Sequence, residues 1–590
     1  MSPAPGMHAA LDGGVVVRVG GPVVVARALR AALYDVVYVG HARLPGEVIR
    51  LESRDAVIQL YEDASGVRPG EPVHSSNAPM RAELGPGLLG RIFDGTQRPL
   101  EVLARRGEDS FASPTVPRGA APPVLDRRRT WEFEPTVEAG DAVGPGDVLG
   151  VVDETPAIQH RVLVPYPLSG TVSNVRAGPL RVDEPVASID RVPVAMLRSR
   201  PVREPARVAR LLDPDTPLIT GQRVIDTLFP LARGGTATIP GGFGTGKTVL
   251  EHTLAKWSDA HVVVYVACGE RGNELSEVLA EFRELVDPLS GAPLMDRTII
   301  VANTSNMPVA ARESSIYTGI TLAEYYRDQG YDVALLADST SRWGEALREV
   351  SSRLEEMPAE EGYPAYLPTR LAEFYGRAGS VVCLGRDARR GSVSIVGAVS
   401  PPGGDFSEPV TQHSLRLAGT FWALDTGLAR QRHFPAIDWG RSYALYRLDD
   451  WFDREVAPGW ARQRQWALDL FAREHALLAI VQLLGTDALA PPEQIVLRTG
   501  RLLREDFLQQ SSFDERDATC PPAKQFLMLE VIRRAHEAMS AAVARGVGAE
   551  TVTAVASLAE VGQMRSWRPD ETPRRAPGLA ARIEQEVEAL

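Results

Sequence analysis

Residues 241–248, GGFGTGKT, match the pattern of a phosphate-binding loop, G-x-x-x-x-G-K-[ST]. Glycines let several backbone N–H groups converge on phosphate oxygens. Lys247 adds a compact charge for the β- and γ-phosphates, and Thr248 adds a hydroxyl for Mg²⁺. The chain has 64 Lys and Arg residues but only three lysines, so a chance match would be rare. We predict that a nucleotide is bound by Gly241, Gly242, Phe243, Gly244, Thr245, Gly246, Lys247, Thr248 and Val249.

The segments on either side of this loop fit the same prediction. TATIP, residues 236–240, has the composition of a short strand, and TVLEHTLAKWSD, residues 248–259, has that of a helix. A helix that begins at the loop places its partial positive charge beside the phosphates. The alternative is a glycine-rich turn that merely contains a lysine, and the strand–loop–helix context argues against it.

Two further segments are continuous apolar runs with an acidic residue at the end or just past it. YDVALLAD, residues 331–338, predicts a buried parallel strand that ends at Asp338, where a carboxylate could hold Mg²⁺. HVVVYVACG, residues 261–269, predicts a second strand with Glu270 just past its end, where a carboxylate could orient the attacking water. Arg271 could hold Glu270 in place or contact phosphate. The alternatives are a cap of the next turn for Asp338 and an exposed loop charge for Glu270.

Residue composition and hydrophobic pattern divide the chain into four regions. Residues 1–80 are rich in Val, Ile, Gly and Pro and predict an N-terminal β-barrel. Residues 112–195 predict a β-rich insertion. Strands alternate with helices from about residue 215, which predicts an α/β domain with a parallel sheet at 81–111 and 196–444. Residues 445–590 predict a C-terminal α-helical domain.

Composition excludes several classes of protein. No stretch approaches 18 consecutive apolar residues, so no transmembrane helix is expected. The first residues, MSPAPGMHAALDGG, lack a basic region followed by an apolar run, so no secretory signal is expected. The three cysteines are too widely spaced for a metal-ligand pair or a disulfide framework. A formal net charge of −12 argues against broad nucleic-acid binding, although it leaves room for a local basic channel.

Several long motifs resemble the catalytic A subunit of V-type and archaeal-type rotary ATPases. Besides GGFGTGKT they are YVACGERGNE, the segment from LLADSTSRWGEALREV to LAEFYGRAG, DFSEPV, HFPAIDWGRSY and FDERDATCPPAKQ. The resemblance covers nearly the whole chain. It implies a β-barrel, a RecA-like P-loop domain that binds ATP or ADP with Mg²⁺, and a helical domain, and it identifies the β-rich block as the insertion of A subunits.

The resemblance also implies roles and partners. Glu270 would activate water, and Phe434 and Phe513 would stack against adenine; without the resemblance, both would be interpreted as core aromatics. A B subunit would alternate with this chain in an A3B3 ring and supply an arginine finger in trans. Stalk subunits would connect the ring to a membrane sector that moves H⁺ or Na⁺, with this chain on the cytoplasmic face. Thr245 replaces the cysteine of many eukaryotic A subunits, so redox control there is not expected.

Other proteins with a phosphate-binding loop remain as alternatives. The β subunit of F-type ATP synthases and the export ATPases of secretion or flagellar systems lack the β-rich insertion. A RecA-like RNA translocase would need a basic channel, which the acidic composition does not favour. A purely structural ring subunit would be expected to lack Lys247 and Glu270.

Overall fold

A computed structural model of the chain describes residues 13–106, 118–288 and 290–590. These residues form two compact units, each built from several segments. Unit 1 contains the described residues up to 211 together with 261–377 and 381–393, and unit 2 contains 212–260, 378–380 and 394–590. The chain passes between the units five times, and three of these passages lie within strands: β18 (Arg210–Leu212), β25 (Gly379–Val382) and β26 (Arg390–Val399).

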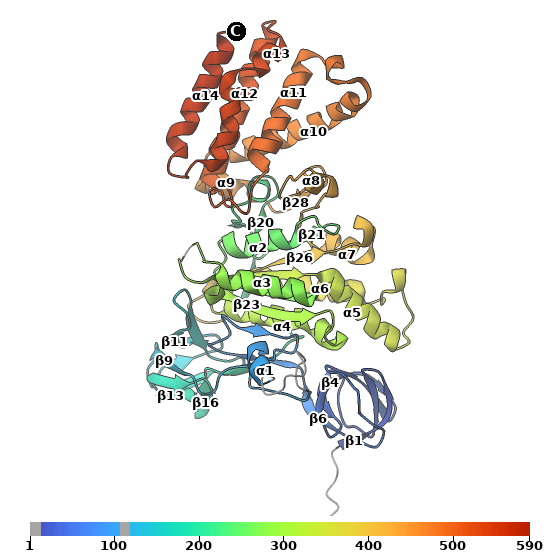
Figure 1. Cartoon of the computed structure of the whole chain (residues 1–590). Coiled ribbons are helices and arrows are strands. Elements are labelled where there is room, and N and C mark those ends of the chain that lie inside the picture. Colours follow the sequence, from blue (N-terminus) through green and yellow to red (C-terminus); the bar gives the residue numbers. More distant parts are fainter. Residues whose placement is uncertain (1–12, 107–117, 289) are drawn as a thin grey trace, which may run out of the picture. The chain divides into compact units, whose positions relative to one another are not determined.

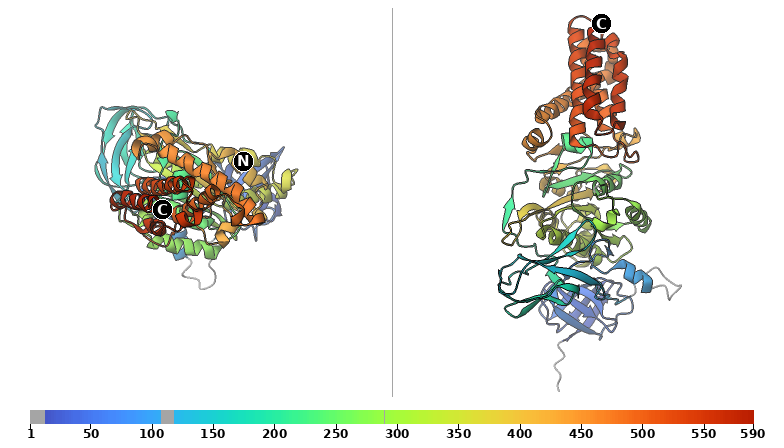
Figure 2. Two further views of the ribbon diagram at one scale, coloured as in Figure 1. Left: turned by 90° about the horizontal axis from the view of Figure 1, so that it is seen from above. Right: turned by 90° about the vertical axis from the view of Figure 1, so that its left-hand side faces the viewer.

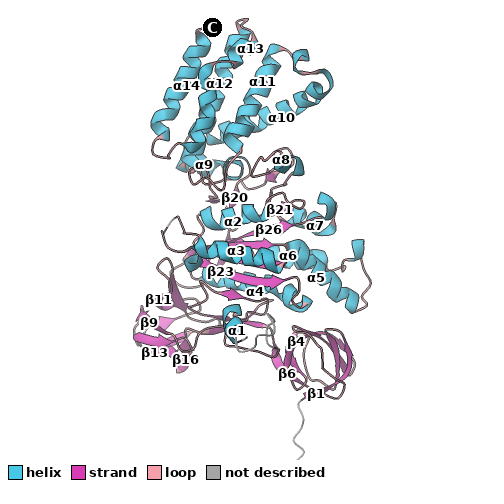
Figure 3. Cartoon of the chain, viewed as in Figure 1, coloured by secondary structure: helices cyan, strands magenta, loops and turns pink. Residues whose placement is uncertain are grey.

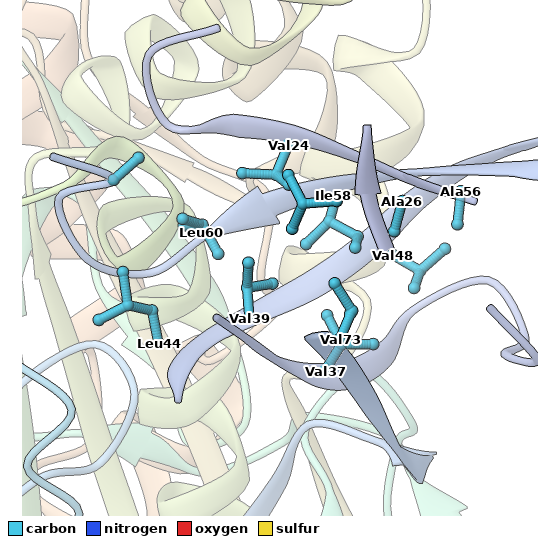
Figure 4. Packing of buried hydrophobic residues seen from close by; sticks show 12 residues of the cluster. Val24, Ala26, Val37, Val39, Leu44, Val48, Ala56, Ile58, Leu60 and Val73 are labelled. Atoms are coloured by element: carbon cyan, nitrogen blue, oxygen red, sulfur yellow. The ribbon is translucent and has the colours of Figure 1, made fainter. Parts of the chain in front are cut away.

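Unit 1 begins with a closed six-stranded barrel, drawn in dark blue in Figure 1. Its order is β1-β2-β5-β4-β3-β6, and β1 pairs with β6 to close it. Alternating aliphatic side chains fill the interior, among them Val24, Val37 and Ile58, all fully buried (Figure 4). Each such side chain contributes about 1.5–3 kcal/mol of hydrophobic stabilisation. The strands are β1 (Gly13–Gly20), β2 (Val23–Arg27), β3 (Asp35–Val39), β4 (Leu44–Glu52), β5 (Asp55–Leu60) and β6 (Pro72–Pro79).

The β-rich insertion consists of two four-stranded sheets, drawn as magenta strands in Figure 3. Trp131 and Phe133 are buried and alternate with exposed residues along β9 (Thr130–Pro135). One sheet contains β10 (Ala142–Val143), β13 (Gly170–Val175), β15 (Pro185–Ile189) and β16 (Val192–Ala195). The other contains β12 (Gln159–Leu163), β11 (Val148–Asp153), β9 (Thr130–Pro135) and β14 (Gly178–Arg181).

A buried polar network fastens the insertion to helix α4 (Val309–Asp328) of the same unit. The Nδ1 of His160 lies 2.9 Å from Glu154 Oε2, and its Nε2 lies 2.9 Å from the Tyr325 hydroxyl. The Tyr326 hydroxyl donates to Glu154 at 3.0 Å, and the Gly87 N–H donates to Glu154 at 2.6 Å. Because every member has a partner, the network rigidifies this junction.

The rest of unit 1 is an α/β layer. Four parallel strands pair in the order β24-β22-β23-β8, and their side chains are buried on both faces, as covered parallel strands require. Helices α3, α4 and α5 pack against β22. The strands are β8 (Ile92–Phe93), β22 (Val262–Glu270), β23 (Thr298–Thr304) and β24 (Asp332–Asp338), with a separate pair, β7 (Arg81–Leu84) and β17 (Arg198–Pro201). The helices besides α4 are α1 (Leu100–Arg106), α3 (Gly272–Glu284), α5 (Thr340–Arg353) and α6 (Leu367–Tyr375).

Unit 2 combines short strands with the C-terminal helices. Strand β21 (Thr236–Pro240) pairs in parallel with β26 and with β27 (Thr420–Phe421), which pairs with β28 (Tyr443–Ala444). Helices α12 and α14 lie side by side, as the right-hand view of Figure 2 shows. The remaining strands and α-helices are β19 (Pro217–Leu218), β20 (Leu231–Ala232), α2 (Lys247–Trp257), α7 (Pro409–Leu417), α8 (Thr426–Arg430), α9 (Asp449–Glu455), α10 (Trp460–Leu484), α11 (Pro491–Arg501), α12 (Pro522–Ala544), α13 (Ala549–Thr553) and α14 (Thr572–Glu588).

The predicted fold class is confirmed: a β-barrel, a β-rich insertion, a parallel α/β region and C-terminal helices are all present. Within the residues described, no helix is both long and apolar enough to cross a membrane. The predicted domain limits at residues 80, 111, 195 and 444 stay predictions. Residues 1–12 and 107–117 lie outside the described residues. Two predictions concern these segments: the absence of a secretory signal at the first residues, and the domain boundary at 111–112.

Candidate functional site

The predicted phosphate-binding loop lies in unit 2 between β21 and α2. Gly244 and Gly246 have φ of +75° and +87°, which only glycine adopts without strain. A Cβ on Gly241 would lie 2.6 Å from Thr245 Oγ1 and 2.8 Å from Leu424 Cβ, so the loop also needs glycine there for space. The turn therefore directs the chain into α2, so that the start of this helix, with its partial positive charge, lies at the loop.

Lys247 is folded back over the loop that carries it. Its Nζ donates to the carbonyl oxygens of Gly241 at 2.7 Å and of Gly242 at 2.9 Å. The buried Thr245 hydroxyl donates to the Gly242 carbonyl at 2.8 Å and braces the turn. At the rim, Phe243 is 92% exposed and Val249 is 45% exposed. A half-buried ammonium at a helix start, surrounded by glycine backbone, fits a polyphosphate.

The two predicted adenine-stacking residues also belong to unit 2, and neither is a core aromatic. Phe434 is 40% exposed and Phe513 is 92% exposed. The Phe434 ring lies 3.4 Å from the position that a Cβ on Gly246 would occupy, so it borders the loop. The Gln510 N–H donates to the Phe434 carbonyl at 2.7 Å, which places the segment that carries Phe513 beside Phe434. An exposed aromatic face next to a phosphate loop can accept a flat base.

A buried ion pair holds the segment that carries Phe513. The Nη1 of Arg223 lies 2.7 Å from Asp517 Oδ1, and both side chains are nearly or fully buried. Arg223 also donates to the carbonyl of Phe507 and, at 2.7 Å, to that of Gln509. Nothing in the sequence around residue 223 indicated that Arg223 holds the segment that carries Phe513.

We expect Arg223→Met to lower the free energy of unfolding of unit 2 by about 3–5 kcal/mol, because it leaves the charge of Asp517 buried without its ion-pair partner. Urea denaturation followed by tryptophan fluorescence measures this change. Arg223→Met/Asp517→Asn should recover part of the loss, since the stranded charge is gone. An equal loss in the exposed control Arg54→Met, or no recovery in the double variant, would contradict the assignment.

His433, next to Phe434, gives a pH dependence to this region. Burial, aided by the positive charge of Arg504, lowers the pKa of His433 to about 4. Between about pH 6.5 and 4 the unfolded chain therefore binds more protons than the native one, so stability is complete above pH 6.5 and falls as the pH drops. We expect wild type to lose about 2 kcal/mol more than His433→Gln between pH 7 and 4.5. Calorimetric melting at both pH values checks this, and the exposed His74→Gln should behave like wild type.

Glu270 belongs to unit 1 and is aimed by a bulge in its strand. We predicted it just past a strand, but it is the last residue of β22. Cys268 pairs with Asn303 and Glu270 with Thr304, so Gly269 is an extra residue in β22. Its φ is +79°, and a Cβ there would lie 2.8 Å from Arg342 Cβ, so glycine is required. The bulge re-aims the Glu270 side chain at the carboxyl end of the sheet.

Asp338 ends β24 as predicted and shares its surroundings with Glu270. It is buried, and the Tyr265 hydroxyl donates to its Oδ2 at 3.4 Å. Burial, together with the negative charges of Asp338 and Glu274, raises the pKa of Glu270, and the guanidinium of Arg342 opposes that rise. A raised pKa is typical of a carboxylate that takes up a proton during catalysis.

The role of Arg271, to hold Glu270 in place or to contact phosphate, stays a prediction. The described ion pair of Arg271 is with Glu274, at 3.9 Å, and its side chain is 66% exposed. Arg342 is the arginine whose charge acts on Glu270, and the sequence alone did not assign it that role. Its place in STSRWGE, four residues after the strand-ending Asp338, was the available signal.

Family models match four consecutive parts of the chain. They are the beta-barrel domain of the ATP synthase alpha/beta family at residues 16–77, the barrel-sandwich domain of ATP synthase alpha/beta subunits at 122–203, the nucleotide-binding domain of that family at 221–444, and the C-terminal domain of V and A type ATP synthase at 449–551. The loop, Glu270 and Asp338 all lie inside the nucleotide-binding match.

Relatives match almost the whole chain. The A subunit of the A-type ATP synthase of Methanopyrus kandleri is 53% identical over 98% of this chain and 98% of its own length. The A subunit of the A-type ATP synthase of Thermococcus kodakarensis is 53% identical over 98% of this chain and 99% of its own length. The second of two such A subunits of Methanospirillum hungatei is 54% identical over 94% of this chain and 95% of its own length.

A solved structure shares the fold at much lower identity. The assembled ATPase EscN of the enteropathogenic E. coli type III secretion system has a TM-score of 0.61 and 21% identity, over 88% of this chain and 99% of that one. That likeness concerns the fold alone and gives no support to an export function. Full-length identity above 50% and a matching V and A type C-terminal domain are decisive: the chain belongs to the family of A-type ATP synthase A subunits, components of a multisubunit enzyme.

Proposed function

We propose that this chain is the catalytic subunit of a rotary ATPase, which hydrolyses or synthesises Mg-ATP while the complete enzyme moves H⁺ or Na⁺ across a membrane. The observation that carries the proposal is the glycine loop with Lys247 at the start of α2, in a chain 53% identical to A-type ATP synthase A subunits over nearly its full length. Nucleotide-binding folds of this kind work chiefly by positioning and by electrostatic stabilisation.

In this proposal the loop N–H groups and Lys247 hold the triphosphate, and Phe434 and Phe513 border the base. When phosphate arrives, the Lys247 ammonium would exchange the carbonyls of Gly241 and Gly242 for phosphate oxygens. Those two contacts keep the ammonium close to the loop beforehand, so little reorganisation is needed.

Thr248 and Asp338 offer the oxygen ligands that Mg²⁺ prefers, and this ion usually takes one or two protein ligands together with substrate phosphates. The bound cation would neutralise negative charge near Asp338 and so favour ionised Glu270. Ionised Glu270 would then orient a water molecule and accept its proton. We infer that the loop residues and the carboxylates of Asp338 and Glu270 act on one nucleotide. The order of the motifs along the chain and the family support this inference.

The partners belong to the same proposal. A B subunit would alternate with this chain in an A3B3 ring and supply an arginine to the site, and stalk subunits would transmit rotation. The chain would work in the cytoplasm, peripheral to the membrane that holds the ion-translocating sector. The export ATPase and RNA translocase alternatives gain no support from the relatives.

Nucleotide binding by a variant without the lysine tests the proposal. We expect Lys247→Ala to weaken ATP binding by about 10²-fold, because charge-assisted hydrogen bonds to phosphate are lost. Lys247→Arg should not restore binding, since a planar fork does not fit the same loop. Calorimetric titration with Mg-ATP measures both.

Lys256→Ala is the matched control, since this lysine lies on the same helix and outside the loop. It should bind ATP like wild type. If Lys247→Ala keeps wild-type affinity, the loop does not bind the phosphates and the proposed function is wrong.

A further inference from the structure

A cavity of about 470 Å³ lies within unit 1 and outside the predicted nucleotide site. Its walls come from the end of β12 with the residues that follow it, from β16, from residues 197–207 including β17, and from the last turn of α4. It therefore opens where the β-rich insertion meets the α/β layer of the same unit. Its volume is in the range of sites for small molecules.

The lining of this cavity is strongly basic, although the whole chain is acidic. Five arginines line it against two carboxylates, Glu204 and Asp328; the arginines are Arg81, Arg198, Arg200, Arg207 and Arg389. Arg200 pairs with Glu324 at 2.6 Å and with Asp328 at 3.5 Å. Arg389 pairs with Asp387 at 2.7 Å. Two of the five charges are thus compensated.

The other three arginines have no carboxylate at ion-pair distance among the described residues. Arg81 donates to the side chain and the backbone carbonyl of Ser199. The Arg207 guanidinium lies 4.5 Å from the centre of the Tyr166 ring, which is 53% exposed. Of the described lining residues, Glu204 is the carboxylate left to balance three positive charges.

Arg198 is the most informative of the three. Its Nη2 is buried, and no described residue accepts a hydrogen bond from it; the same holds for Nε of Arg200. Burial lowers the pKa of Arg198, although the charge of Asp328 opposes that shift, as expected for a guanidinium removed from water. A buried guanidinium nitrogen without an acceptor destabilises a fold, so its retention needs a reason.

We propose that this cavity is a second ligand site, which takes a small phosphate-bearing anion between Arg81, Arg198 and Arg207. Guanidinium groups match the oxygens of phosphate in paired hydrogen bonds, and three of them supply the donors that such a group needs. The exposed Tyr166 ring offers an apolar wall for the rest of the ligand. The insertion and α4 both contribute walls to the cavity. A bound ligand would therefore contact both of them and hold them together.

Calorimetric titration with inorganic pyrophosphate tests the proposal in the full-length chain that carries Lys247→Ala, in which binding at the glycine loop is weakened by about 10²-fold. We expect saturable binding of one pyrophosphate per chain. Adding Arg198→Met or Arg207→Gln should weaken it by about tenfold each, as expected for loss of a charge-assisted hydrogen bond. Arg54→Gln/Arg128→Gln, two exposed arginines outside the cavity, should leave the affinity unchanged.

The melting temperature separates a ligand site from a structural role. Because Arg198 Nη2 has no described acceptor, Arg198→Met should not lower the melting temperature of the ligand-free chain. Arg207 is exposed, so Arg207→Gln keeps the test valid if Arg198→Met folds poorly. Absence of saturable binding, equal binding in the cavity variants, or equally tight binding of succinate would overturn the proposal.

Discussion

Replacing Glu270 with Gln is expected to lower the rate of ATP hydrolysis by about 10³-fold while ATP affinity stays within about threefold of wild type. Gln has nearly the same shape but cannot accept the proton of the attacking water. The raised pKa of Glu270, caused by burial and by the charges of Asp338 and Glu274, suits a proton acceptor. Single-turnover hydrolysis, together with calorimetric ATP binding, separates the chemical step from binding.

Glu274→Gln is the matched control, because this carboxylate is also close to Glu270 but lies on the first turn of α3. It should change the rate by less than about tenfold. If Glu270→Gln keeps its rate, or if both variants lose it equally, Glu270 is not the proton acceptor and another carboxylate must be assigned.

Addition of the cognate B subunit is expected to raise ATP turnover by about 10³- to 10⁵-fold over that of the isolated chain. This range is what an arginine supplied in trans contributes when it stabilises the charge that develops on the transferred phosphoryl group. The isolated chain should bind Mg-ATP yet turn it over slowly. Steady-state hydrolysis, measured while the B subunit is titrated against a fixed amount of this chain, follows the effect.

Two controls sharpen the result. The mixture of the B subunit with Glu270→Gln should remain slow, since the trans arginine cannot replace the proton acceptor. A B subunit whose interface arginines are changed to Ala one at a time should identify the residue involved. Full turnover by the isolated chain would show that its site is complete alone, and the shared-site proposal would fail.

The sequence by itself determined the elements and the motif chemistry. TATIP and GGFGTGKT predicted β21 and the turn into α2, because glycine spacing and strand composition are local properties. The apolar runs that became β22 and β24 could be recognised because strands buried on both faces contain no alternation. Full-length resemblance then indicated the roles of Phe434 and Phe513, which no local pattern distinguishes from core aromatics.

Only the tertiary structure decided the details that depend on contacts between distant segments. Gly269 forms a bulge only because of the way β22 pairs with β23. The direction of the Glu270 side chain therefore depends on the partner strand. Arg342 acts on Glu270 because α5 packs against β22. The arginine cavity likewise joins residues more than a hundred positions apart. Burial, pairing and electrostatic fields arise from proximity in space, which spacing along the chain does not encode.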